Sequence, residues 1–273
     1  MNRYPQTLFL IFPGLLLMIA AFVVPVAGML ILGIQDDIGF TADHLWRFLA
    51  DPYSLRIGLR TIRLSLIISL VCTVIGLPMA YVMARGSRKV RMLLLIAVIL
   101  PLMTSVVVRT FGWMVVLGRN GVIPDMLNAL NLVSRNFSLM HTETAIVVGM
   151  VQIVLPFMVL SVLGVAQRLD PRLEEAARVM GCSFTGALRR VVLPGAMPGI
   201  VAGFLLTFSL SASYFVTPTL LGGARLPTLA GSIYEAATKT LDWPFAAAQS
   251  IILLLGLMFL LLPWSLAGRV RNG

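Results

Sequence analysis

The sequence predicts an all-α integral membrane protein with six transmembrane helices and no sheet. Of its 273 residues, 59% are hydrophobic and only 12% are charged, whereas soluble domains carry about 25% charged residues. The apolar residues gather in six long runs, each of about 20 residues or more, enough for a helix to cross about 30 Å of hydrocarbon. The net charge of +10 is scattered over the segments between the runs, so it indicates membrane topology rather than a nucleic-acid partner.

The first of the six apolar runs follows Arg3 and is too long for the core of a signal peptide, which has about 7–15 residues, so it is interpreted as an uncleaved span. A short helix is expected at 123–132, in the loop after the third run. Without internal repeats or linkers, residues 1–273 are interpreted as a single transmembrane domain. The six spans are expected at about 8–33, 62–84, 92–117, 144–165, 199–221 and 246–266.

Basic residues give the orientation. The N-terminus, the loops after the second and fourth spans, and the C-terminal tail lie on one side and hold twelve of the 21 lysines and arginines. Four of them form a compact cluster without acids at 85–91. Because Lys and Arg near span ends favour the cytoplasm, this side and both termini are expected to be cytoplasmic.

The loop at 168–197 is the most polar long segment in the second half of the chain. Asp170 can cap a helix and Pro171 suits its first turn. Gly181 is placed to stop this helix. Ser183 can cap a second short helix that is expected to end at Pro194. Within the first helix, an apolar stripe is expected at i, i+3, i+4 and i+7, formed by Leu173, Ala176, Ala177 and Met180.

This loop resembles the EAA loop of ABC-importer permeases. The resemblance lies in Glu175-Ala176-Ala177, then Gly181, then Val191 two residues before Leu193-Pro194; the usual pattern has isoleucine in place of Val191. An amphipathic helix lying on the bilayer is the plainer alternative. The resemblance implies a type I importer permease fold whose coupling helix docks into a cytoplasmic ATPase. The residues expected to carry this coupling are Leu173, Glu174, Glu175, Ala176, Ala177, Met180, Gly181, Leu193 and Pro194.

Further segments resemble the spermidine/putrescine branch of these permeases. They are 109–121, 214–223 and 242–248. Membership implies a multi-pass protein of the bacterial inner membrane, a second homologous permease, two copies of the ATPase and a periplasmic substrate-binding protein. It implies that ATP and Mg are bound by the ATPase, with no cofactor in this chain. A polyamine substrate follows from the branch, but an amino-acid derivative or an organic anion stays open, because no carboxylate lies near the middle of a span.

Several polar residues inside the spans are candidates for a translocation path. Ser105, Arg109 and Trp113 share a helical face, although Arg109 could instead snorkel to the interface. Hydroxyl groups follow one face of the fifth span; they could line a passage or bond helix to helix. Prolines at 78, 101, 156 and 218 indicate curved packing or hinges. The remaining path candidates are Gln152, Thr207, Ser211, Tyr214 and Thr217.

Other functions lack their residues in this sequence. A hydrolytic triad, a metal-ligand cluster around His44 or His141, and a phosphate-binding loop are absent. A secondary transporter needs coupling carboxylates in the membrane, and a channel needs a filter or a charged ring. The chain is therefore interpreted as a non-enzymatic permease subunit.

Overall fold

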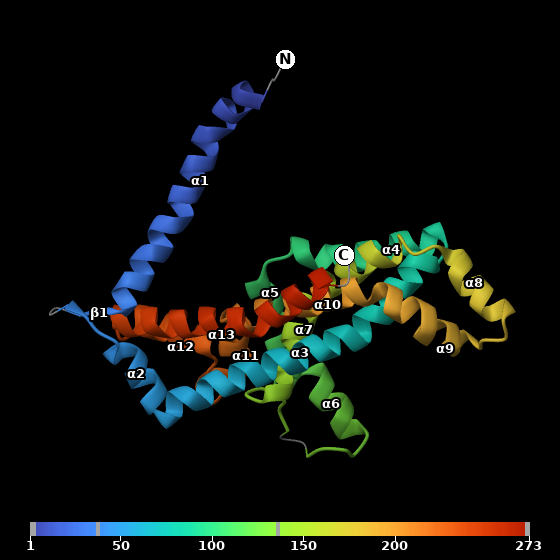
Figure 1. The fold of residues 1–273 in the computed structure, drawn as a ribbon. Coiled ribbons are helices and arrows are strands. Elements are labelled where there is room, and N and C mark those ends of the chain that lie inside the picture. The colour runs from blue at the N-terminus through green and yellow to red at the C-terminus, as the bar shows by residue number, and fades with distance from the viewer. Residues whose placement is uncertain (1–3, 37–38, 135–136, 271–273) are drawn as a thin grey trace. The chain divides into compact units, whose positions relative to one another are not determined.

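Long α-helices make up most of the chain in the computed structural model (Figure 1). It describes the backbone of residues 4–36, 39–134 and 137–270, and the side chains of residues 12–35, 39–134 and 137–259. The chain divides into two compact units, one of residues 1–55 and 232–256, the other of residues 56–231 and 257–273. The expectation of a single transmembrane domain stays a prediction.

The first unit joins the beginning of the chain to part of its last helix. Arg47 donates a hydrogen bond to the Asp242 carboxylate at 2.9 Å, and its guanidinium lies 4.4 Å from the centre of the Phe245 ring. These contacts fasten the helix of Arg47 to the turn before the last helix. The elements are α1 (Tyr4–Gly33), β1 (Gln35–Asp36), β2 (Gly39–Phe40), α2 (Asp43–Ala50), most of α12 (Leu229–Thr238) and the first half of α13 (Trp243–Val270).

The prediction of no sheet is wrong in one detail. The strands β1 and β2 form a two-stranded antiparallel pair of two residues each, in which Gln35 faces Phe40 and Asp36 faces Gly39. So short a pair is a local turn after α1 and leaves the all-α character of the fold unchanged.

The second unit is built around α7 (Glu143–Ala166), which has buried residues on all sides. Its main partner is α10 (Leu193–Ser213). A Cβ at Gly199 would lie 2.8 Å from the carbonyl oxygen of Ser161, and one at Gly203 would collide with Met158. Small residues four positions apart let two membrane helices approach closely, so this pair sets the α7–α10 contact.

The remaining elements surround this pair or connect it. Helices α4, α5 and α11 also pack on α7. These elements are most of α3 (Pro52–Arg85), α4 (Arg88–Ile99), η1 (Leu100–Met103), α5 (Val106–Leu117), α6 (Val122–Ala129), α8 (Pro171–Val179), α9 (Phe184–Ala187), the π-helix η2 (Leu188–Val192), α11 (Val216–Gly222) and η3 (Gly223–Arg225).

Helices long and apolar enough to cross a membrane confirm the predicted class of fold. A shorter apolar helix, Trp243–Phe259, stands at the sixth predicted span; α13 itself continues to Val270. Among the described residues, the five longer candidates are Phe12–Gly33, Pro52–Arg85, Val106–Ala129, Glu143–Ala166 and Phe184–Ser213.

Three predicted spans differ from the helices observed. The second helix begins at Pro52, ten residues before the predicted start. The third run is broken: α4 ends at Ile99, and Thr104 has extended backbone before α5 begins. Pro101 has no amide proton to donate to the helical ladder. Its carbonyl accepts a hydrogen bond from the amide of Thr104, three residues later, at 3.2 Å. A continuous helix at 92–117 is therefore wrong.

The fifth run is broken near its far end. Helix α10 stops at Ser213, Tyr214 is extended with ψ of 134°, and α11 begins at Val216. Pro218 falls in the first turn of α11, where a missing amide donor leaves no helical bond unmade. The apolar run thus contains a helix restart that a hydropathy pattern does not reveal.

Candidate functional site

Helix α8 opens the polar loop and is capped at its N-terminus. The carboxylate of Asp170 accepts a hydrogen bond from the amide of Arg172 at 3.0 Å. Pro171 is the first helical residue, a position that needs no amide donor. The cap predicted from the sequence is confirmed.

Gly181 ends α8 in a left-handed conformation, with φ of +89°. Its amide donates to the carbonyl of Arg178, and the amide of Cys182 donates to the carbonyl of Ala177, both at 3.0 Å. These two bonds form a Schellman motif, which satisfies carbonyls that the helix leaves free. The predicted stop is confirmed, although the helix ends at Val179, one residue before the expected Met180.

The two faces of α8 differ in what they contact. Leu173 is 55% exposed and Met180 80% exposed, and Ala176 between them is exposed as well. The expectation for Ala177 is corrected: it is only 5% exposed and faces its own chain. It lies three residues after Glu174 and shares its inner face, so the outward stripe consists of Leu173, Ala176 and Met180.

The inner face of α8 is tied to the end of α3 by a carboxylate. Glu174 accepts a hydrogen bond from the Tyr81 hydroxyl and a second from Nε of Arg85 at 3.4 Å. Arg85 also donates through Nη1 to the carbonyl of Leu169 at 3.1 Å. The side chains of Arg85 and Glu174 are 19% and 12% exposed. We call Tyr81, Arg85 and Glu174 the clamp.

Sequence reasoning placed Glu174 in the coupling loop but missed both of its partners. Tyr81 and Arg85 lie 93 and 89 residues earlier in the chain. Arg85 is part of a basic cluster that predicts topology, and Tyr81 lies in an apolar run, so neither has a local signal for a contact with α8.

After Gly181 the chain forms one continuous helical stretch into α10. The Ser183 hydroxyl caps α9 by accepting from the amide of Gly186 at 3.2 Å. The expected end at Pro194 is wrong: the amide of Leu193 bonds to the carbonyl of Leu188, five residues back, and the helix continues. A π turn is one residue wider than an α turn, and it joins α9 to a helix that accepts Pro194 in its first turn.

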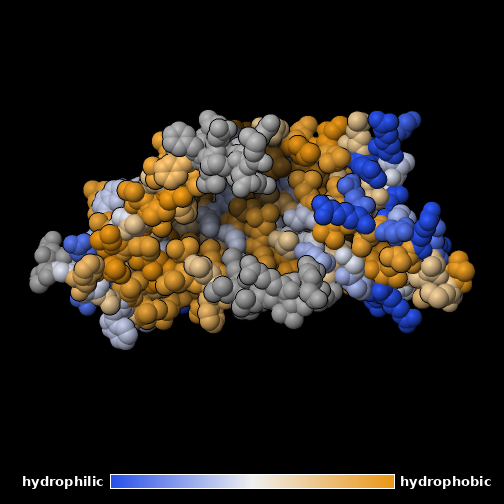
Figure 2. Space-filling view, turned by 45° about the horizontal axis from the view of Figure 1, so that its top comes forward, coloured by the Kyte–Doolittle hydropathy of each residue, from blue (hydrophilic) through white to orange (hydrophobic). Residues whose placement is uncertain are grey.

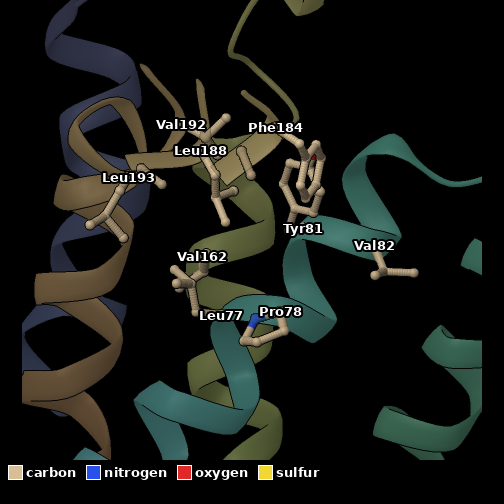
Figure 3. Close-up of a pocket in the computed structure, with 11 residues that line it drawn as sticks. Leu77, Pro78, Tyr81, Val82, Val162, Phe184, Leu188, Val192 and Leu193 are labelled. Atoms are coloured by element: carbon tan, nitrogen blue, oxygen red, sulfur yellow. The ribbon is translucent and has the colours of Figure 1, made fainter. Parts of the chain in front are cut away.

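An apolar cavity of about 280 Å³ lies between α3, α7 and the α9–α10 stretch (Figure 3). The rings of Tyr81 and Phe184 meet edge to face at its border, with centroids 6.1 Å apart. One side of the Tyr81 ring thus borders apolar space while its hydroxyl reaches Glu174. The lining residues are Leu77, Pro78, Tyr81, Val82, Val162, Ala166, Phe184, Leu188, Val192, Leu193 and Ala196.

Strongly hydrophilic residues, drawn in blue, gather at the end of the second unit where α8 and α9 lie, while orange, hydrophobic residues prevail over much of the remaining visible surface (Figures 1 and 2). This contrast suits a loop that stands in water beside membrane-spanning helices. The exposed charged residues from α8 to η2 are Arg172, Glu175, Arg178, Arg189 and Arg190.

The polar face predicted around Arg109 is divided between two environments. Ser105 precedes α5 and is exposed, whereas Trp113 packs against the hydrophobic core. The Nε and Nη1 atoms of Arg109 are buried, and no described residue offers them a hydrogen-bond partner. Arg109 is itself half-buried, and buried polar nitrogens without an acceptor are costly; whether Arg109 faces a path stays a prediction.

Two of the predicted hydroxyl groups serve packing inside the unit. Thr207 is fully buried and donates to the carbonyls of its own helix. Thr217 is fully buried and bonds to Thr110 of α5 at 2.8 Å. The Thr217 bond matches the helix-to-helix alternative, whereas Thr207 bonds within its own helix.

Two of the other path candidates keep a polar atom without a partner among the described residues. Oε1 of Gln152 and Oγ of Ser211 are buried and have no hydrogen-bond partner among the described residues. Tyr214 is half-buried, at the break between α10 and α11. Whether these residues line a path stays a prediction. Nowhere in the described ranges do three His, Cys, Asp or Glu side chains group to hold a metal ion.

Comparison with known proteins fits this arrangement of apolar spans and a capped polar loop. Residues 73–272 match the family described as binding-protein-dependent transport system inner membrane component. The chain belongs to this family. The permease is 35% identical over 233 residues to the spermidine/putrescine transport system permease protein PotB of Escherichia coli (strain K12), across 85% of this chain and 84% of that protein.

Two more matches support the family and the fold. The permease is 34% identical over 224 residues to PotB of Haemophilus influenzae, across 82% of this chain and 78% of that protein. A chain of the bacterial alginate ABC transporter, crystallised with an alginate-bound periplasmic protein, superposes with a TM-score of 0.77 at 19% identity and 93% coverage of both chains. The permease therefore has the type I ABC importer permease fold and is an inner membrane component.

Proposed function

We propose that this permease forms half of the translocation path of an ATP-driven importer, and that α8 is the helix that docks into its cytoplasmic ATPase. The observation that carries this proposal is the exposed stripe of Leu173, Ala176 and Met180 on a helix capped at both ends. A nine-residue helix is marginal alone in water. The two caps and the contacts of the inner face keep α8 folded in the absence of a partner. Its apolar outer face is exposed and can bind one.

The partners follow from this assignment. ATP and Mg bind to two copies of an ATPase subunit, a second homologous permease supplies the other half of the path, and a periplasmic binding protein delivers the solute. The polar loop and both termini then lie in the cytoplasm, in agreement with the excess of basic residues on that side. Arg109 is expected to face the partner permease, because a charge with buried, unpartnered nitrogens is costly against lipid.

A polyamine is the proposed solute. The support is the identity of about a third with permeases named for spermidine and putrescine, over most of both chains. One observation favours a second candidate, a solute that carries a carboxylate: the guanidinium of Arg109, with two buried nitrogens that lack a partner among the described residues, would attract an anion and repel a polycation.

The test is uptake by the complete transporter, reconstituted in vesicles with the products of the neighbouring genes. Radiolabelled spermidine is expected to enter only with ATP and the binding protein, and excess unlabelled putrescine should compete while a small organic acid should not. Competition by the acid alone would favour the second candidate.

A variant of the docking stripe tests the role of α8 in the same vesicles. Leu173→Asp places a charge in an interface that excludes water, at a cost of several kcal/mol. It should insert normally, lose the ATPase on purification and lose uptake. The matched control is Leu132→Asp, which changes a leucine that is 68% exposed on a different loop. If Leu173→Asp keeps both the ATPase and full uptake, α8 is not the docking helix.

A further inference from the structure

The clamp joins the proposed docking helix to a membrane helix other than the one that follows it in sequence. Helix α8 packs on α9 and η2, its neighbours along the chain. Its connection to α3 is made by side chains, with the Glu174 carboxylate between the Tyr81 hydroxyl and the Arg85 guanidinium. We propose that the clamp is a coupling linkage: through it, α8 and the end of α3 move as one body when the ATPase moves.

The burial of the clamp strengthens its hydrogen bonds and holds α3 and α8 in one arrangement. With the side chains of Arg85 and Glu174 at 19% and 12% exposed, water competes poorly for their hydrogen bonds. Removal of one partner leaves a charge with fewer acceptors or donors, which costs more than the loss of an exposed ion pair. The end of α3 is therefore held to α8 in one arrangement, and a displaced α8 pulls on Tyr81 and Arg85.

Arg85 is held from a second direction. Its Nη1 donates to the carbonyl of Leu169, in the turn before α8. The end of α3 is itself fixed by the next helix, because Arg91 donates to the carbonyls of Met83 and Ala84 at 2.8 and 3.2 Å. Force on Glu174 thus reaches a helix end whose terminal carbonyls are already tied down.

Helix α3 has a point at which it can bend, about one turn before the clamp. Pro78 lies inside α3, three residues before Tyr81, and its missing amide removes one hydrogen bond from the ladder. Leu77, Pro78 and Tyr81 also border the apolar cavity. A small shift of the end of α3 relative to α9 and α10 can be taken up by closing or opening this space, with the contact between the Tyr81 and Phe184 rings at its border.

This inference rests on the proposed function, since it takes α8 as the helix that the ATPase moves. Two variants test it in the reconstituted complex. Tyr81→Phe keeps the ring and its contact with Phe184 but removes the hydroxyl that reaches Glu174. Glu174→Gln keeps the shape and removes the charge. The matched control is Tyr53→Phe, at the opposite end of the same helix, where the side chain is 58% exposed.

The first readout is the number of solute molecules imported per ATP hydrolysed. Loss of a hydrogen bond to a charged group corresponds to about a tenfold change in the equilibrium it supports. In Tyr81→Phe and Glu174→Gln the ratio should therefore fall about tenfold while the ATPase still co-purifies. Tyr53→Phe should keep the wild-type ratio.

The second readout does not depend on transport. Spin labels at Arg172→Cys, on the exposed start of α8, and at Ser87→Cys, just beyond α3, report the distance between the two elements in a chain that also carries Cys72→Ala and Cys182→Ser. With the intact clamp the distance distribution should be narrow and unchanged by nucleotide. Tyr81→Phe and Glu174→Gln should broaden it.

The outcomes separate the two proposals. A broad distribution with the intact clamp, a wild-type import ratio in both variants, or loss of the ATPase from Tyr81→Phe would each overturn the linkage. A wild-type complex that holds no ATPase would refute the proposed function instead, and the distance distributions would still decide whether the clamp fixes α8 to α3.

Discussion

The hydroxyl groups of Thr110 and Thr217 meet 2.8 Å apart, and both side chains are fully buried. Thr110 also lies 2.8 Å from the carbonyl of Val106, to which it donates its proton. Since a hydroxyl has one proton, Thr217 must donate to Thr110. This single bond ties α11 to α5 directly, and both helices contact α7.

At the residue scale we expect Thr217→Val to destabilise the permease by about 1 kcal/mol, within the range measured for hydrogen bonds between membrane helices. Thr110→Val should cost a similar amount, and the double variant less than the sum, because either change alone breaks the same bond. Thermal unfolding in detergent measures these costs. Ser213→Ala, whose exposed hydroxyl bonds only within its own helix, is the control. Strict additivity of the two threonine changes would show that the bond contributes nothing.

At the element scale, the end of α8 depends on one backbone conformation. No atom lies within 4 Å of a Cβ built on Gly181, so a side chain there meets open space. The cost of a substitution comes from its φ of +89° alone. Left-handed backbone costs about 1–2 kcal/mol for residues with a Cβ and less for asparagine.

Gly181→Val should therefore loosen the last turn of α8, and Gly181→Asn should do so less. Hydrogen exchange of peptides covering 171–190 measures this, with faster exchange expected in the order valine, asparagine, glycine. Exchange in Gly181→Val equal to that of the wild type would mean that the Schellman motif does not limit the stability of the helix.

The elements also show why part of the site could be predicted from sequence and part could not. Asp170, Ser183 and Gly181 act through neighbours within five residues, so local chemistry was sufficient to find both caps and the stop. Local chemistry does not determine how α8 is rotated about its own axis, so its inner and outer faces could not be predicted. Leu173 and Ala177 belong to the same apolar pattern, yet only Ala177 faces the chain, because Glu174 beside it finds Tyr81 far away in sequence.

The helix breaks were hidden for a related reason. A proline in an apolar run is compatible with a kink, a full break or a restart of the helix. At Pro101 the chain breaks, at Pro156 α7 continues through it, and at Pro194 a π turn precedes it. The surrounding packing decides between these outcomes, and hydropathy contains no information about it.

At the scale of the whole molecule, the proposed topology of six spans predicts that the polar loop and the segment after α12 lie on opposite sides of the membrane. We expect Thr240→Cys to react with a membrane-impermeant maleimide in intact spheroplasts, because the proposed topology puts its loop in the periplasm. The matched change Thr185→Cys, in α9, should react only after the membrane is permeabilised. Cys182→Ser removes the competing thiol. The reverse pattern would invert the proposed orientation.

The π-helix in front of Pro194 joins the polar loop to the membrane interior as a single rod. The helical stretch Phe184–Ser213 has 30 residues, a length of about 45 Å at 1.5 Å per residue. Because each residue turns a helix by about 100°, one inserted residue in this rod would reset the angle of α9 and α8 against the α7–α10 pair. Exchange of this loop between permeases therefore demands equal residue counts after Ser183, whereas the turn at Gly181, between α8 and α9, lies before this helical stretch.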